Sequence, residues 1–184
     1  MDLRYRPDVQ GLPTVDFRPY MIETAYDYYS VGTTAAQERM GLACVLSALS
    51  LEICLKSFFA IVAGNPGKLN ESYQYDRELL PKGSNGHGLL QFAEALAPEI
   101  RSYLFDRHDL ETLGINSNLF TNSRYTYEPQ ANQVHDDDII KLAAKTVCNL
   151  TYLYRAQGCQ DPFINGFDID KLYFSAVQRF AYVR

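Results

Sequence analysis

The sequence of 184 residues has no tryptophan, only three histidines, and fewer basic than acidic residues. Its net charge of -5 argues against a broad basic face for gripping duplex nucleic acid, although a local arginine patch stays compatible with it. The N-terminal residues show no apolar run after their charges, so no secretory signal is expected. What the chain has in excess is tyrosine, with 14 residues, which suits an interface or a polar pocket as well as a core.

Cysteine is scarce and lacks the spacing of a metal site. No two of the four cysteines are arranged as C-x-x-C, and the first three lie within apolar helical patterns. We therefore expect reduced, buried thiols in a cytoplasmic protein, without a disulfide framework, a metal site or a cofactor. The residues concerned are Cys44, Cys54, Cys148 and Cys159.

The sequence also lacks a long uncharged apolar run. Its longest apolar stretch, Met40 to Leu51, is followed by Glu52 and Lys56. Because a membrane span needs about 20 nearly uncharged residues, this stretch predicts a buried core helix and no membrane association.

Helical periodicity is the main positive signal. Apolar residues recur at helical spacing over 35–63, 89–96 and 139–154, and no segment alternates cleanly with a period of two. We predict an all-α fold, an antiparallel up-and-down helical bundle with three or four principal helices. Residues 1–34 are expected to form an N-terminal arm with a possible short helix, and residues 35–184 a single helical-bundle domain.

The segments between these helices carry turn signals. Residues 65–86 predict a long connection with one helical turn, and Pro98 is expected to break or kink the helix before it. A short helix is expected from residue 107, and Gly158 is expected to end the last strong helix. The sequence leaves the form of residues 159–184 open.

One charged pair stands within the most apolar helix. Glu52 and Lys56 are four residues apart, so their side chains share one face of the helix. A partly exposed pair of this kind contributes only about 0.3–0.5 kcal/mol. The alternative is a desolvated pair that other buried polar groups complete, since burying two ions costs several kcal/mol otherwise.

Two distant segments carry residues that could complete this pair. His87 lies at an expected helix start with glycine on either side, which permits close approach of the backbone. Arg124, beside Tyr125, offers a forked donor for a carboxylate such as Glu52 or for a phosphate. Each could equally be a solvent-exposed loop residue.

The segments "LEICLKSFF", "GHGLLQFAEAL" and "NSRYTYE", in this order and followed by a long helix, resemble the HEPN superfamily, the higher eukaryotes and prokaryotes nucleotide-binding domain. The resemblance covers roughly residues 35–157. Thr126 stands where the family pattern usually has proline. The positions that match the family motif are Glu52, Lys56, His87 with Leu89, and Arg124 with Tyr125.

The resemblance implies an up-and-down bundle, usually dimeric, that binds RNA or nucleotides. Some members are metal-independent ribonucleases that carry an arginine, four to six intervening residues and then a histidine. Arg101 and His108, with six residues between them, fit this count. On one continuous helix the two side chains would share a face. The histidine could then transfer protons at a ribose 2′-hydroxyl while the arginine stabilises the phosphorane.

The sequence thus favours a non-catalytic HEPN-like homodimer that binds a nucleotide, RNA or a partner protein. One alternative is a metal-independent endoribonuclease of a toxin or phage-defence system. The other is a purely structural or regulatory helical interaction protein. Whether the protein is an enzyme is left open by the sequence.

Overall fold

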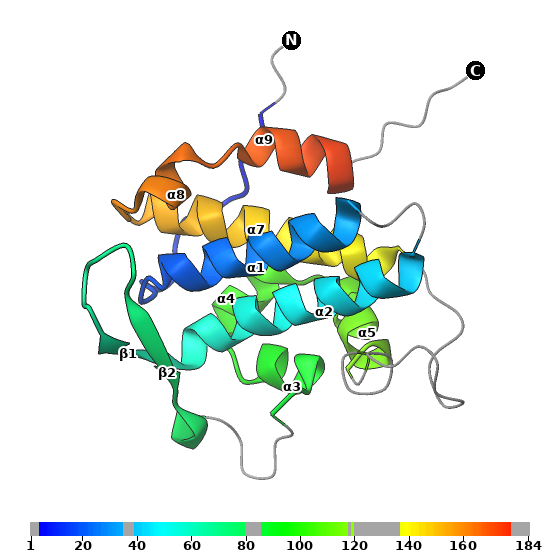
Figure 1. The fold of residues 1–184 in the computed structure, drawn as a ribbon, viewed down its shortest axis with the longest axis horizontal. Helices are drawn as coiled ribbons and strands as arrows, with labels where there is room; N and C mark the ends of the chain where they lie inside the picture. The colour runs from blue at the N-terminus through cyan, green and yellow to red at the C-terminus, as the bar shows by residue number, and fades with distance from the viewer. Residues whose placement is uncertain (1–3, 35–38, 80–85, 118, 120–136, 178–184) are drawn as a thin grey trace.

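The computed structural model describes residues 4–34, 39–79, 86–117, 119 and 137–177. These residues are mostly helical, as the sequence predicts. Three long helices lie against one another: α1 (Pro19–Thr34), α2 (Met40–Lys56) and α7 (Asp138–Ala156). Figure 1 shows α2 running back along α1, with α7 behind them.

Shorter helices cover two sides of this central group. On one side lie α3 (Leu89–Glu94), α4 (Pro98–Leu104) and α5 (Arg107–Ile115), with Pro98 as the first residue of α4. The expected break at Pro98 and the expected short helix from residue 107 are therefore confirmed. On the other side, α8 (Pro162–Gly166) and α9 (Ile169–Leu172) follow the turn at Gly158, whose φ is 88° (Figure 1).

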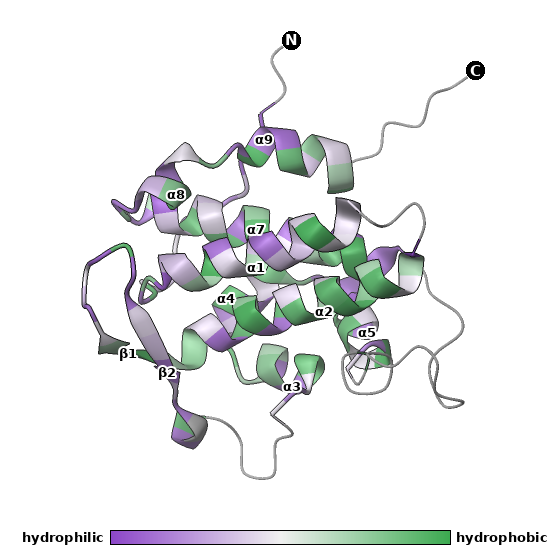
Figure 2. Ribbon diagram, viewed as in Figure 1, coloured by the Kyte–Doolittle hydropathy of each residue, from purple (hydrophilic) through white to green (hydrophobic). Residues whose placement is uncertain are grey.

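Helix α2 is the core helix of the molecule. The stretch Met40–Phe59 has the length and hydropathy of a membrane span, but 67% of its most apolar window is buried inside the protein. Figure 2 shows apolar residues all along α2. Its buried side chains include Cys44 and Cys54, and all four cysteines of the chain are buried and free, as expected.

The helix ends earlier than the sequence suggests. Residues 57–59 form a 3₁₀ turn, and the hydroxyl of Ser57 donates to the carbonyl oxygen of Cys54 at 2.6 Å. The next residues form strand β1 (Ala60–Gly64), which pairs antiparallel with β2 (Ser72–Tyr75). The expected helix to residue 63 is wrong here, because β-branched Ile61 and Val62 favour a strand once a partner strand is present.

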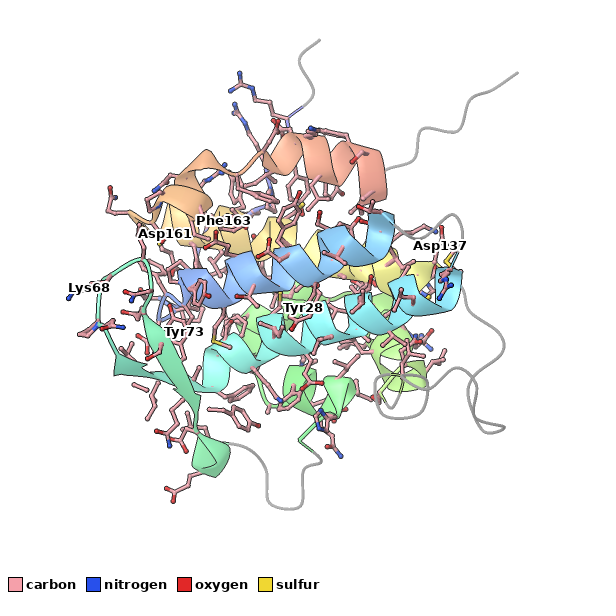
Figure 3. All side chains as sticks on the ribbon, in the orientation of Figure 1. Tyr28, Lys68, Tyr73, Asp137, Asp161 and Phe163 are labelled. Atoms are coloured by element: carbon pink, nitrogen blue, oxygen red, sulfur yellow. The ribbon has the colours of Figure 1, made fainter. Side chains whose placement is uncertain are left out.

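The N-terminal segment contacts the hairpin through a buried arginine. Arg18 is buried at the end of the arm, and its Nε donates to the carbonyl oxygen of Ala60 at 2.9 Å. Its guanidinium also lies 5.8 Å from the ring centre of Tyr73, labelled on the hairpin in Figure 3. Within residues 1–34, where the sequence allows a short helix, the structure has α1, and this helix contributes Ile22, Ala25 and Tyr29 to the core.

Three charged side chains link α5 to α7. The Nζ of Lys145 lies 2.5 Å from Oδ2 of Asp109 and 3.2 Å from Oδ2 of Asp106. Asp106 and Asp109 also form a reciprocal capping box at the start of α5. The capping box sets the start of α5 at Arg107, so α4 ends before it, at Leu104.

We expect the Asp106 carboxylate to stabilise the fold at neutral pH and to lose this effect in acid. The main-chain N–H of Asp109 donates to it, and this hydrogen bond, helped by Lys145, holds the pKa of Asp106 below its ordinary value of 3.8. A carboxyl whose pKa is lowered by folding stabilises the folded state above its ordinary pKa, and the contribution disappears as the pH falls through the folded-state pKa. Because the side chain is largely exposed, Asp106→Asn should lower the free energy of unfolding by less than about 1 kcal/mol at pH 7.

Urea unfolding of both proteins at pH 7 and in acid well below pH 3.8 tests this expectation. Asparagine keeps the capping geometry without the charge, so the two proteins should converge in acid. Glu94→Gln, which changes an exposed carboxylate, is the matched control. A difference for Asp106→Asn that stays constant over the whole pH range would contradict the expectation.

Candidate functional site

The charged pair of α2 is buried on its acidic side. The side chain of Glu52 is only 5% exposed, while Lys56, one turn later, is 22% exposed. The Nζ of Lys56 lies 2.6 Å from Oε1 of Glu52. The pair is therefore the desolvated arrangement of the two that the sequence allowed.

A third group reaches Glu52 from a distant segment. His87 lies just before α3, and its Nδ1 is 3.1 Å from both Oε1 and Oε2 of Glu52. Because carboxylate oxygens only accept hydrogen bonds, this geometry places a proton on Nδ1 of His87. Glu52 thus receives one donor from its own helix and one from a residue 35 positions later in the chain.

Two aromatic rings lie near the ammonium group of Lys56. The Nζ of Lys56 lies 5.2 Å from the ring centre of Tyr75 and 5.6 Å from that of Phe92. Both distances are in the range of a cation–π contact. Strand β2 supplies Tyr75 and helix α3 supplies Phe92, so the hairpin and α3 both help to hold the ammonium group. We call Glu52, Lys56, His87, Tyr75 and Phe92 the Glu52 cluster.

The cluster keeps its carboxylate inside and places its two nitrogen-bearing side chains, Lys56 and His87, closer to the surface. His87 is the more exposed of these two side chains, with 43% of it accessible, and Lys56 follows with 22%. An incoming group would therefore meet an ammonium and an imidazole before it met the carboxylate. Such a surface is suited to an anion such as a phosphate rather than to a cation. The remaining predicted binding residues, Arg124 and Tyr125, lie outside the described residues.

The expected geometry of Arg101 and His108 is wrong. Arg101 is in α4 and His108 is in α5, and Phe105 between them is extended. The Nη1 of Arg101 is 3.4 Å from the carbonyl oxygen of Glu94, while the largely exposed His108 has its Nε2 3.7 Å from Asp138. The two side chains do not share a face of one helix, because the capping box starts a new helix at residue 107.

A second polar group, which sequence reasoning missed, joins the arm to α7. The hydroxyl of Tyr5 donates to Oδ1 of buried Asn149, and the hydroxyl of Tyr103 donates to the carbonyl oxygen of Asn149 at 2.8 Å. Burial raises the pKa of both tyrosines, so both are neutral donors at physiological pH. An asparagine in the apolar pattern of 139–154 and an abundance of tyrosine were the available signals, but neither identifies the partner.

Arg155, at the end of α7, was also missed. Its Nε donates to the carbonyl oxygen of Ile164 at 2.5 Å, and its Nη2 donates to that of Phe167. These bonds hold the guanidinium over the segment that follows Gly158. Desolvation lowers the pKa of Arg155.

Comparison of the chain with protein-family models, with curated proteins and with solved structures finds no match.

Proposed function

We propose that this chain is a non-catalytic, HEPN-like helical-bundle domain that binds a nucleotide or RNA through a phosphate at the Glu52 cluster. The observation that carries the proposal is the convergence of Lys56 and His87 on one buried carboxylate. These residues occupy the positions, in the order along the chain, that the HEPN-like pattern assigns to them.

The energetics of the cluster support a binding role over a purely structural one. A buried ion pair is a poor stabiliser, because desolvation offsets much of its Coulomb energy. Here Glu52 is nearly inaccessible, whereas His87 stays almost half exposed. Glu52 can therefore orient the ammonium of Lys56 and the ring of His87 without itself touching the ligand, and Nε2 of His87 donates to a phosphate when the ring carries both protons.

The proposal includes a homodimer, which exposed apolar side chains on α1 and α2 support. Tyr28, labelled in Figure 3, Val31 of the same helix, and Leu42 of α2 are all accessible. Exposed apolar groups on adjacent helices are typical of interaction surfaces. They equally favour the second candidate, a helical interaction protein, and sedimentation at micromolar concentration tests the dimer.

Replacement of His87 tests the binding site. His87→Ala should weaken the binding of ATP or of a single-stranded RNA decamer by roughly 5–20-fold, as expected for the loss of one charge-assisted hydrogen bond to phosphate. Fluorescence anisotropy with labelled ligands, without divalent metal, measures this. His108→Ala is the matched control because it removes another accessible imidazole, and its affinity should equal that of the wild type.

The same two variants separate the competing functions. Equal affinities for the wild type and His87→Ala would contradict a phosphate site at the Glu52 cluster. RNA cleavage without metal that disappears in His108→Ala would favour the endoribonuclease instead. No binding of any nucleotide or RNA by the wild type would leave the interaction protein as the remaining candidate.

A further inference from the structure

A cavity of about 260 Å³ lies between the N-terminal arm, the end of α7 and the start of α9. Figure 1 shows the N-terminal segment reaching α9 at the top of the molecule, whereas α3 lies at the bottom. The cavity is therefore separate from the Glu52 cluster. Its lining consists of the arginines Arg4, Arg6 and Arg155, the aromatic residues Tyr5, Tyr152 and Phe167, the carboxylates Asp168 and Asp170, and Ile169.

Tyr5 fixes the arm at the mouth of this cavity. Its ring stacks on Tyr173 with centres 3.7 Å apart, and its main-chain N–H donates to Oδ1 of Asp170 at 2.7 Å. Its hydroxyl bonds Asn149. Three independent contacts hold this one residue, so Arg4 and Arg6 on either side of it are positioned, although both are exposed.

The cavity carries an excess of positive charge in an acidic protein. Three guanidinium groups line it against two carboxylates, while the whole chain has a net charge of -5. One carboxylate, Asp168, caps α9 by accepting from the N–H of Lys171 at 2.9 Å. The other, Asp170, accepts from Tyr5. Both carboxylates are thus engaged in holding the walls of the cavity.

Arg155 supplies the fixed element of the site. It is half buried, and two carbonyl oxygens hold its Nε and Nη2. Within the part of the chain that the structure describes, no carboxylate forms an ion pair with Arg155 or Arg6. Burial lowers the pKa of Arg155 more than the nearby charges of Asp168 and Asp170 raise it, so the two carboxylates compensate its desolvation only in part. A bound anion would complete this compensation.

We propose that this cavity is a second phosphate-binding site, in which Arg155 and Arg6 bind a phosphate group. The phosphate belongs either to a larger ligand or to free pyrophosphate. Arginine is the residue best matched to phosphate oxygens, because its planar fork donates two parallel hydrogen bonds. The volume is below that of a pocket for a whole drug-sized ligand, so the site takes the phosphate and leaves any base or sugar outside. This site does not depend on the proposed function of the Glu52 cluster.

Arg6→Gln is the variant of choice, since Arg6 is exposed and no hydrogen bond of the described structure uses its side chain. Arg107→Gln is the matched control: it removes an arginine of α5 that is 94% exposed and on a different side of the molecule (Figure 1). Arg155→Gln is the stronger change, but it also removes the bonds to Ile164 and Phe167, so it is interpreted only if its far-ultraviolet circular dichroism matches the wild type.

Two probes distinguish the sources of the phosphate. Millimolar pyrophosphate should raise the Tm of the wild type and of Arg107→Gln by roughly 2–4 °C, and that of Arg6→Gln by less than half as much. A labelled single-stranded RNA decamer should bind Arg6→Gln about 3–10-fold more weakly than Arg107→Gln if the phosphate belongs to a polynucleotide.

The outcomes are separable from those for the Glu52 cluster. Pyrophosphate stabilisation that Arg6→Gln loses and His87→Ala keeps supports the second site, even if no RNA binds. Selective loss of RNA affinity in Arg6→Gln supports it for polynucleotides. Equal responses of Arg6→Gln and Arg107→Gln to both probes would overturn the second site. The proposal for the Glu52 cluster would then still be tested separately by His87→Ala.

Discussion

Glu52→Ala should lower the free energy of unfolding by about 3–5 kcal/mol, the cost of removing one partner from a buried ion pair. The alanine would leave the ammonium of Lys56 without the carboxylate that lies 2.6 Å away, and the imidazole of His87 without its acceptor. The lysine would then be held between the rings of Tyr75 and Phe92 with only cation–π contacts, which are weaker than the lost ion pair.

The double variant Glu52→Met/Lys56→Met separates two effects on the free energy of unfolding: the cost of leaving one charge unpaired and the contribution of the intact ion pair. Replacement of a whole buried pair by apolar side chains of similar size is often close to neutral. The double variant should therefore be more stable than Glu52→Ala by roughly 2 kcal/mol, as measured by urea unfolding. Glu94→Ala, at an exposed position, should change stability by less than about 0.5 kcal/mol. A double variant as unstable as Glu52→Ala would mean that the pair itself is strongly stabilising.

Local spacing made part of the site predictable. Glu52 and Lys56 meet because a helix places residues four apart on one face, and the apolar sequence around them indicated that the pair would be desolvated. The long helices α2 and α7 followed from the same periodicity. His87 could be named only as one possible partner, since nothing local to it selects a residue 35 positions earlier.

Other features depend on partners that spacing does not encode. Residues 60–64 continue the apolar pattern of α2, and only pairing with Ser72–Tyr75 makes them a strand. The number of residues between Arg101 and His108 matches the ribonuclease motif. The capping box at the start of α5, however, divides that stretch into two helices. The helix start expected at residue 107 already argued against one continuous helix over both residues, and the structure has that start.

The positions of Tyr5 and Arg155 illustrate a further limit. The arm residue Tyr5 contacts Asn149 and Asp170, more than 140 residues away in the chain. Nothing in the local sequence of the arm selects these partners, because a tyrosine between two arginines is compatible with any surface. The cavity lined by arginines arises only when residues 4–6 and 167–170 meet at the end of α7.

Phe92→Ala should destabilise the protein by about 3–5 kcal/mol and also loosen the Glu52 cluster. The ring of Phe92 is fully buried, with centres 6.1 Å from Phe59 and 6.2 Å from Tyr75. Alanine would leave a cavity where α3 meets α2 and β2, and it would remove one of the two rings beside Lys56. Since α3 directly follows His87, we expect the imidazole to lose its fixed position against Glu52.

Phe92→Leu is the matched control, because leucine keeps most of the buried volume but lacks the ring. It should cost only about 1–2 kcal/mol, from imperfect packing and the lost aromatic contacts. Urea unfolding gives the stabilities, and anisotropy with labelled ATP or RNA gives the affinities. If the fold of α3 positions the site, the affinity of Phe92→Ala should fall with His87→Ala while Phe92→Leu stays near the wild type. The contrary outcome is that Phe92→Ala loses the expected ~3–5 kcal/mol and still, under conditions where it is folded, binds as tightly as the wild type. That result would mean that α3 supports the core without positioning His87.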